Sequence, residues 1–316
     1  MSVYTNITAP DLEAFLRRYQ VGVLFDYTGI AAGIENTNYF VTTDQGRFVL
    51  TLFERTPAGE LQYCLELMAF LADHAIPSAH PLANSAGEYL QHFKGKPAAL
   101  VQRLDGASVA NPDREHCRAI GATIGRMHQI TMTYQATRDN DRGVEWQATT
   151  AALIRDRLSS TEQTLLDIEL DFLRHYDFKC LPQAAIHADL FRDNALFEGH
   201  TLTGLIDFYY AHIGPLIYDL AVTVSDWCFD AHGSFDTDRA RAMVQAYAAQ
   251  RTVIKREVNA WLACLRAAGL RFWLSRLKDQ NFPRDGEITH IKDPNRCKAV
   301  LESCHRHADQ LQSVWQ

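Results

Sequence analysis

The amino-acid sequence predicts an α+β protein of two unequal lobes: a small antiparallel-sheet lobe with one or two helices, then a larger, mainly helical lobe. A length of 316 residues favours two domains over one. β-Branched and aromatic residues concentrate between positions 21 and 54 and recur before position 104, whereas helical spacing dominates after Gly106. We therefore expect domains at residues 1–104 and 105–316, with a small-molecule site in the cleft between them.

The first domain opens with a helix in "TAPDLEAFLRRY", where Thr8 can cap the helix and Asp11 follows three residues later. The next stretch, "VGVLFDYTGIAAGIENTNYFVTTDQGRFVLTLFE", is rich in strand-forming residues and broken by glycine-containing turns. It predicts two or three antiparallel strands joined by hairpins. An amphipathic helix then ends near His74, and "EYLQHF" and "PAALVQRL" predict two more strands.

The second domain begins with a helix in "PDREHCRAIGATIGRMHQI", whose apolar face includes Ile120 and Ile124. The polar stretch 131–149 predicts a loop, and helices follow over residues 150–175. Short strands return in the segment that ends in "GLIDF". From Leu216 onward the sequence is helical, apart from a loop in "DQNFPRDGEITHIKDPN".

Composition excludes several classes of protein. The net charge of −7 argues against a nucleic-acid-binding protein held by phosphate contacts. We expect a cytoplasmic protein with no membrane partner, because "MSVYTNITAPDL" lacks the pattern of a secretory signal and no apolar stretch could cross a bilayer. The seven cysteines are scattered and form no C-x-x-C pair, which predicts buried, reduced thiols. The sequence does not distinguish a monomer from a homodimer.

The densest polar chemistry lies in "HADLFRDN", where His187, Asp189 and Asn194 form H-x-D-x-x-x-x-N. Asp207 follows thirteen residues later in "GLIDF". A carboxylate in a loop can accept the proton of a hydroxyl, while an amide oxygen and a second carboxylate suit Mg²⁺. Phosphoryl transfer needs one group to orient the attacking oxygen and others to hold the metal and the phosphates. The motif therefore predicts phosphoryl transfer.

Together with this motif, "GIENTNYFV", "FVLTLFE", "IYDLAVTVSDWC" and "LRFWLSRL" resemble the type II homoserine kinases of bacteria. That family belongs to the aminoglycoside and choline phosphotransferase branch of the bilobal protein-kinase-like fold. The resemblance covers nearly the whole chain. It implies phosphorylation of the side-chain hydroxyl of L-homoserine, a step of threonine biosynthesis, with ATP and Mg²⁺ as cofactors.

The resemblance also implies roles for individual residues. Asp189 corresponds to the catalytic base, and Asn194 and Asp207 correspond to the Mg²⁺ ligands. His187 is expected to be structural and to pack under the loop. Asp219, in "YDLA", resembles the buried aspartate that accepts hydrogen bonds from the catalytic-loop backbone, so its loss should damage folding as well as chemistry.

The nucleotide-binding residues implied by the resemblance are Gly29, Ala32, Gly33, Thr51, Gln102 and Leu104. One departure concerns the phosphate-binding lysine of kinase-like enzymes, which is replaced by Thr51. Its usual glutamate partner falls near Cys64, with Glu66 two residues away. The lysine and its glutamate partner are expected to be lost together, because either charge left without the other in a cleft would be costly.

The substrate-binding residues expected from the sequence are Asn36, Asn38, Asp226, Trp227 and Arg271. Homoserine carries an ammonium, a carboxylate and a hydroxyl group, so its site should offer an acid and a guanidinium in addition to the base. Arginine pairs with a carboxylate in bidentate fashion better than lysine does. Trp227 lies at a predicted helical position, so a place in the hydrophobic core is also consistent with the sequence.

Three other functions stay open from the sequence. The same chemistry could act on an aminoglycoside, choline or methylthioribose. The threonine at position 51 would also fit an inactive, nucleotide-binding pseudokinase. A metal-dependent phosphoester hydrolase could use His187, Asp189 and Asp207, although the histidines are sparse and not clustered.

Overall fold

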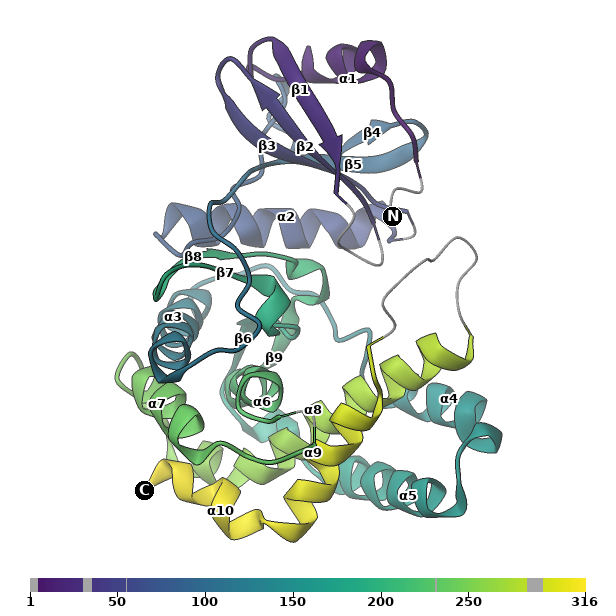
Figure 1. Ribbon diagram of the computed structural model, residues 1–316, viewed down its shortest axis with the longest axis vertical. Coiled ribbons are helices and arrows are strands. Elements are labelled where there is room, and N and C mark those ends of the chain that lie inside the picture. The colour runs from purple at the N-terminus through teal and green to yellow at the C-terminus, as the bar shows by residue number, and fades with distance from the viewer. Residues whose placement is uncertain (1–4, 31–35, 55, 231, 283–291) are drawn as a thin grey trace. The chain divides into compact units, whose positions relative to one another are not determined.

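The computed structural model describes residues 5–30, 36–54, 56–230, 232–282 and 292–316 (Figure 1). The chain divides into two compact units, one containing the described residues up to Asp105 and the other beginning at Gly106. We call them unit 1 and unit 2 and describe each by itself. The boundary lies one residue from the junction expected from the sequence.

Unit 1 contains a five-stranded antiparallel sheet in the order β1-β2-β3-β5-β4. The strands are β1 (Leu24–Gly29), β2 (Thr37–Thr43), β3 (Gly46–Leu52), β4 (Gln91–Phe93) and β5 (Lys96–Gln102). Side chains alternate between buried and partly buried along β2, which is the period of two that a strand with one core face requires. The strands predicted for this part of the sequence are confirmed.

Two helices pack on this sheet, on opposite sides of it in Figure 1. α1 (Ala9–Leu16) starts at a capping box in which Thr8 and Asp11 satisfy each other's backbone N–H groups, as predicted. Its Leu12 and Phe15 join a hydrophobic cluster with one face of β2 and β3. α2 (Ala58–Asp73) buries a continuous apolar stripe and has His74 as its C-cap residue, so it ends near His74 as predicted.

Unit 2 is mainly helical. Its helices are α3 (Arg114–Thr131), α4 (Val144–Ile154), α5 (Ser160–His175), α6 (Leu216–Trp227), α7 (Thr237–Ala248), α8 (Lys255–Asn281), α9 (Asn295–Arg306) and α10 (Ala308–Gln312). Short 3₁₀ helices are η1 (Arg155–Arg157), η2 (Phe178–Cys180), η3 (Arg192–Asn194), η4 (Phe208–Tyr210) and η5 (Ser313–Trp315). Two antiparallel strand pairs complete it: β6 (Gln183–Ile186) with β9 (His212–Pro215), and β7 (Ala195–Glu198) with β8 (Thr201–Leu205).

The core of unit 2 forms around α6, of which every residue is buried. α3, α7 and α8 lie around it in Figure 1. α3 approaches α7 closely because it carries Gly121, where a Cβ atom would meet the backbone oxygen of Met243 at 2.2 Å. This packing holds α6 in place, and the turn that follows β6 is hydrogen-bonded to Asp219 in the first turn of α6.

Two sequence expectations need correction. The stretch 131–149 is not entirely a loop, because α4 begins at Val144. It has no side-chain cap at Gly143, and its buried face includes Gln147 and Thr150, so packing against α8 stabilises a helix that local signals do not mark. β9 was not expected from the sequence.

The seven cysteines are free, as predicted, and six are buried, whereas Cys180 is exposed.

No helix in the described part of the chain has both the length and the apolar character needed to cross a membrane.

Candidate active site

The H-x-D motif occupies the turn that follows β6, and the carboxylate of Asp219 fixes this turn. The backbone N–H groups of His187 and Ala188 donate to the two oxygens of Asp219 at 3.0 and 2.7 Å. Ala188 has a φ of 63°, an uncommon conformation for a residue with a side chain. Asp219 lies in the first turn of the fully buried α6, so the turn is anchored to the core of unit 2.

A buried chain of hydrogen bonds supports Asp219 from behind. His128 Nε2 donates to Asp219 Oδ2 at 3.0 Å, and the Tyr247 hydroxyl lies 2.9 Å from His128 Nδ1. Arg251 Nε donates to the same hydroxyl at 2.6 Å, and its guanidinium pairs with Glu257. The roles are consistent with a neutral His128, because burial lowers the pKa of that ring. Burial alone would raise the pKa of Asp219, but the hydrogen bond from His128 holds it below its usual value.

His187 is completely buried, and both of its ring nitrogens are used. Nε2 donates to the carbonyl oxygen of Ile206 at 2.9 Å, and Nδ1 accepts from the backbone N–H of Asp189 at 3.3 Å. Burial lowers the pKa of His187, which matches the neutral tautomer that these two contacts require. The ring therefore joins the Asp189 turn to the segment that leads into Asp207.

Asn194 makes a second connection between the same segments. Its Nδ2 donates to the backbone oxygen of Asp189 at 2.8 Å and lies 3.3 Å from Asp189 Oδ2. Its backbone oxygen accepts from the N–H of Ile206 at 3.0 Å. Ile206 is thus held by His187 on one side and by Asn194 on the other, and Asp207 is the next residue. Asp207 adopts a left-handed conformation with φ 65° and has an exposed side chain.

Arg138 holds the other side of the Asp207 turn. Its Nη1 donates to the backbone oxygens of Tyr209 and Ala211 at 2.9 and 2.8 Å. Neither Arg138 nor His128 was expected from the sequence. The one signal available was that His128 lies four residues after Ile124, on the apolar face of the predicted helix, where a polar ring needs a buried partner.

Arg271, on α8, places its guanidinium beside the Asp189 carboxylate. Its Nη1 lies 3.7 Å from Asp189 Oδ1. Its guanidinium stacks over Phe272 at 3.9 Å and over Tyr210 at 4.9 Å, and its side chain is 5% exposed. These rings hold the guanidinium in one orientation beside the predicted base.

Asp226 and Trp227 lie at the end of α6, and their surroundings do not suit the substrate contacts expected from the sequence. The Trp227 side chain is fully buried, and its Nε1 donates to the backbone oxygen of Leu190 at 3.2 Å. Asp226 Oδ2 accepts from the backbone N–H and the Nε of Arg192 at 2.9 and 3.0 Å, and Arg296 lies 3.5 Å from Oδ1. Both side chains hold residues 190–192 from inside unit 2, so we correct their assignment to a structural one.

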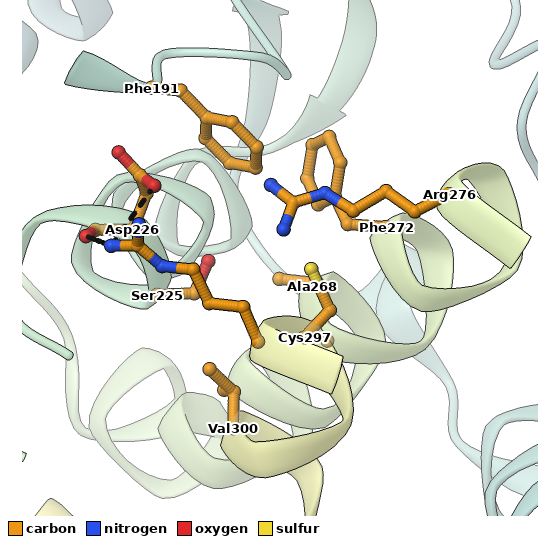
Figure 2. Close-up of a pocket in the computed structure, with 10 residues that line it drawn as sticks. Phe191, Ser225, Asp226, Ala268, Phe272, Arg276, Cys297 and Val300 are labelled. Atoms are coloured by element: carbon orange, nitrogen blue, oxygen red, sulfur yellow. Dashed lines mark hydrogen bonds and ion pairs between the residues drawn. The ribbon is translucent and has the colours of Figure 1, made fainter. Parts of the chain in front are cut away.

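Figure 2 shows this interior, where Phe191, Phe272 and Arg276 surround a cavity of about 10 Å³, with Asp226 at its edge. The rings of Phe191 and Phe272 lie 4.3 Å apart, and Arg276 Nη1 donates to the backbone oxygen of Asp293 at 3.1 Å. The cavity has room for about one water molecule, so it does not hold an amino acid.

In unit 1, Thr51, which the resemblance aligns with the lysine of kinase-like enzymes, has a polar partner. Thr51 pairs with Asn38 across β2 and β3, and its hydroxyl donates to Asn38 Oδ1 at 2.7 Å. Cys64 is buried, and its thiol lies 3.5 Å from the backbone oxygen of Glu60, so α2 offers no acid at that position. The polar contact of Thr51 here is thus a neutral hydrogen bond to Asn38.

The remaining nucleotide-site candidates are placed along the same sheet. Gly29 ends β1, Gln102 ends β5 with an exposed side chain, and Leu104 follows it, partly buried. Asn36, which was expected to contact the substrate, lies just before β2, and its backbone oxygen is 3.4 Å from Asn38 Nδ2. Ala32 and Gly33 lie outside the described residues.

A model of the phosphotransferase enzyme family matches residues 26–252, and the chain belongs to this family. The homoserine kinase of Methylobacillus flagellatus is 47% identical over 315 residues, which cover 100% of this chain and 99% of that protein. The homoserine kinase of Pseudomonas aeruginosa strain UCBPP-PA14 is 44% identical over 279 residues, 88% of each chain.

Solved structures show the fold. An amicoumacin kinase in complex with AMP-PNP and Ca²⁺ superposes with a TM-score of 0.71 at 16% identity, covering 93% of each chain. The spectinomycin phosphotransferase APH(9)-Ia in complex with ADP gives 0.70 at 12% identity, covering 97% of this chain and all of the other. The protein-kinase-like fold predicted from the sequence is confirmed.

Proposed function

We propose that the protein transfers the γ-phosphoryl group of ATP to the side-chain hydroxyl of L-homoserine and releases O-phospho-L-homoserine and ADP. The observation that carries this proposal is full-length identity of 40–47% to homoserine kinases of several bacteria. The catalytic loop supports it, because Asp189 and Asn194 are held together by hydrogen bonds that also fix the segment before Asp207.

Asp189 is the proposed base. The hydroxyl oxygen of homoserine attacks the γ-phosphorus, the bond to the β,γ-bridging oxygen breaks, and the hydroxyl proton passes to the Asp189 carboxylate. Asn194 Nδ2 at 3.3 Å and Arg271 at 3.7 Å each face a different oxygen of this carboxylate. These contacts orient the carboxylate before the substrate arrives, which is how a positioned base contributes to the rate.

Asn194 and Asp207 are the proposed ligands of Mg²⁺. The Asn194 carboxamide uses its N–H group toward Asp189, which leaves the amide oxygen as the donor atom for a cation. Asp207 adds an exposed carboxylate, and oxygen donors of these two kinds suit Mg²⁺. When bound, the ion would neutralise the charge that develops on the phosphate oxygens. Asp219 accepts a hydrogen bond from the Ala188 N–H, and His187 donates to the backbone oxygen of Ile206, so these two structural residues fix the backbone next to the proposed base and next to Asp207.

Arg271 is the proposed partner of the substrate carboxylate. In homoserine only a short chain separates the hydroxyl oxygen from the carboxylate, so the group that binds the carboxylate must lie near the base. Arg271 meets this condition, and its stacked, buried guanidinium offers two parallel N–H donors. Asn36 and Asn38 of unit 1 remain proposed substrate contacts, and Gly29, Thr51, Gln102 and Leu104 remain proposed nucleotide contacts.

A substrate panel tests the proposal. Release of ADP is measured with purified protein, ATP and Mg²⁺, in the presence of L-homoserine, choline, methylthioribose, an aminoglycoside or no acceptor, and the product is identified by mass spectrometry. We expect L-homoserine to raise the rate by about tenfold or more over every other condition, as preferential binding of one transition state requires. Equal stimulation by choline or the aminoglycoside would contradict the substrate assignment. Nucleotide binding without acceptor-dependent ADP release would indicate a pseudokinase.

A further inference from the structure

A group of three metal-binding side chains lies in unit 2 outside the catalytic loop. Asp113 caps α3, His116 is the third residue of that helix, and His200 lies in the turn between β7 and β8. Asp113 Oδ1 is 2.7 Å from His116 Nδ1, and Asp113 Oδ2 is 2.8 Å from His200 Nε2. One potential ligand atom from each side chain lies within 4.8 Å of the other two.

The hydrogen bonds of His116 direct a lone pair of its ring toward the Asp113 carboxylate. Its Nε2 lies 3.1 Å from the backbone oxygen of Gly199, which can only accept, so Nε2 carries a proton. Its Nδ1 then holds a lone pair in the neutral ring, yet it faces a carboxylate oxygen of Asp113 at 2.7 Å. The backbone N–H of Asp113 donates to the same Nδ1 at 3.4 Å, as part of the capping box of α3. A cation bound by both the ring nitrogen and the carboxylate would satisfy this pair of acceptor atoms.

We propose that Asp113, His116 and His200 bind a divalent transition-metal ion of the class that prefers imidazole, with Zn²⁺ as the representative. Two imidazole nitrogens and one carboxylate oxygen are ligands that Zn²⁺ takes, and a water molecule would complete a tetrahedron. Ligand atoms of such a site are about 3.4 Å apart. One ligand atom from each of the three side chains already lies within 4.8 Å of the others, so small side-chain shifts would bring them around one ion. The bond from His116 Nε2 to Gly199 is the type of contact that orients a ligating histidine.

Such an ion would tie the start of α3 to the β7–β8 turn. In Figure 1 this strand pair lies beside α3. β7 begins directly after Asn194, and β8 ends two residues before Asp207. Because both proposed Mg²⁺ ligands flank this strand pair, fixing its turn would stabilise the segment that carries them. The inference concerns nitrogen ligands, which Mg²⁺ does not favour, and it does not depend on the identity of the phosphorylated substrate.

The test uses the full chain freed of metal with a chelator, without nucleotide or acceptor. ZnCl₂ is titrated by calorimetry, and Co²⁺ is added separately to record the visible absorption of a low-symmetry site. His200→Ala removes one ligand from an exposed turn. His175→Ala is the matched control, because His175 is an exposed histidine that lies 3.5 Å from one aspartate, Asp171.

We expect one Zn²⁺ per chain in the wild type and in His175→Ala, unaffected by Mg²⁺, and an affinity reduced about tenfold or more in His200→Ala. The Co²⁺ absorption should be lost in the same variant, and Zn²⁺ should raise the thermal midpoint of the wild type more than that of His200→Ala. Zn²⁺ binding that is absent from the wild type, or equally strong in His200→Ala, would overturn the proposal.

Discussion

The carboxylate of Asp219 accepts hydrogen bonds from His187 N–H, Ala188 N–H and His128. Because these donors are buried, each would lose its partner if the carboxylate were removed, and an unsatisfied buried donor costs about 1–3 kcal/mol. This one side chain therefore stabilises the fold and also sets the conformation of the turn that carries Asp189.

The variant Asp219→Asn separates this role from a catalytic one. It keeps the size of the side chain but places an amide N–H against a donor, so we expect both a lower thermal midpoint and a lower kcat. Differential scanning calorimetry and steady-state kinetics on the same preparation measure the two effects. A variant that loses activity at an unchanged midpoint would show that Asp219 acts mainly in the chemistry.

Arg271 allows a test of substrate recognition at the level of one residue. Arg271→Gln should raise KM for L-homoserine about tenfold or more while KM for ATP changes little, because a charge-assisted bidentate pair with the substrate is lost. Arg271→Lys should restore part of the affinity, since it returns the charge without the planar fork.

The control for Arg271 lies on the same helix. Arg266 also stacks on an aromatic ring, Phe172, at 3.5 Å and pairs with a buried acid, Glu169, at 2.9 Å. Arg266→Gln should lower stability but leave KM for L-homoserine unchanged. If the two variants change KM alike, the carboxylate assignment of Arg271 is wrong.

At the scale of helices and strands, most of unit 1 could be predicted because its signals are local. The Thr8–Asp11 capping box and the alternating burial of β2 are properties of short windows of sequence. α4 could not be predicted, since its buried face carries Gln147 and Thr150 and its stability comes from α8. β9 is likewise defined by its pairing with β6, more than twenty residues earlier.

The candidate site likewise contains residues that a local motif marks and residues whose role depends on distant partners. Asp189, Asn194 and Asp207 stand in a recognisable motif, so spacing alone suggested their chemistry. The buried partners come from far away in the sequence: His128 reaches Asp219 across 91 residues, and Arg138 reaches Tyr209 across 71. No local pattern encodes such distances. Trp227 was misassigned because the sequence does not reveal on which side of a fully buried helix a side chain lies.

The contact between α3 and α7 provides a prediction at the same scale. Gly121→Ala would place a Cβ atom 2.2 Å from the backbone oxygen of Met243, and backbone cannot yield as a flexible side chain does. We expect a loss of about 1–3 kcal/mol in the free energy of unfolding, measured by denaturant titration.

Gly59→Ala is the matched helix control for this experiment. Gly59 is exposed near the start of α2, with no atom within 4 Å of its added Cβ. This substitution should stabilise the protein by about 0.4–1 kcal/mol, because it reduces the freedom of the unfolded chain. If both substitutions change the free energy of unfolding in the same direction and by a similar amount, helix propensity, and not the close packing of α3 on α7, determines the effect of Gly121→Ala.

At the scale of the whole molecule, buried neutral histidines make stability depend on pH. Burial lowers the pKa values of His128, His187 and His212 in the folded state. In the unfolded chain they titrate near their ordinary value of about 6.5, so below that pH the unfolded state binds more protons than the folded state. Their contribution to stability is therefore complete above about pH 6.5 and decreases as the pH falls toward their folded pKa values.

The thermal midpoint should accordingly fall between about pH 7.5 and 5.5. The slope should be shallower in His212→Asn, a variant that removes one of the three titrating rings from the β6–β9 pair. Calorimetry in buffers of matched ionic strength measures both slopes. A midpoint that is constant, or that rises on acidification, would show that these rings are protonated in the folded protein.

The most direct test of the central claim is the turnover number of Asp189→Asn with ATP and L-homoserine. The account predicts a decrease in kcat of about 10²–10⁴-fold, with an unchanged thermal midpoint, because Asp189 takes the hydroxyl proton and is only partly buried. Wild-type turnover in this variant would contradict the assignment of Asp189 as the base.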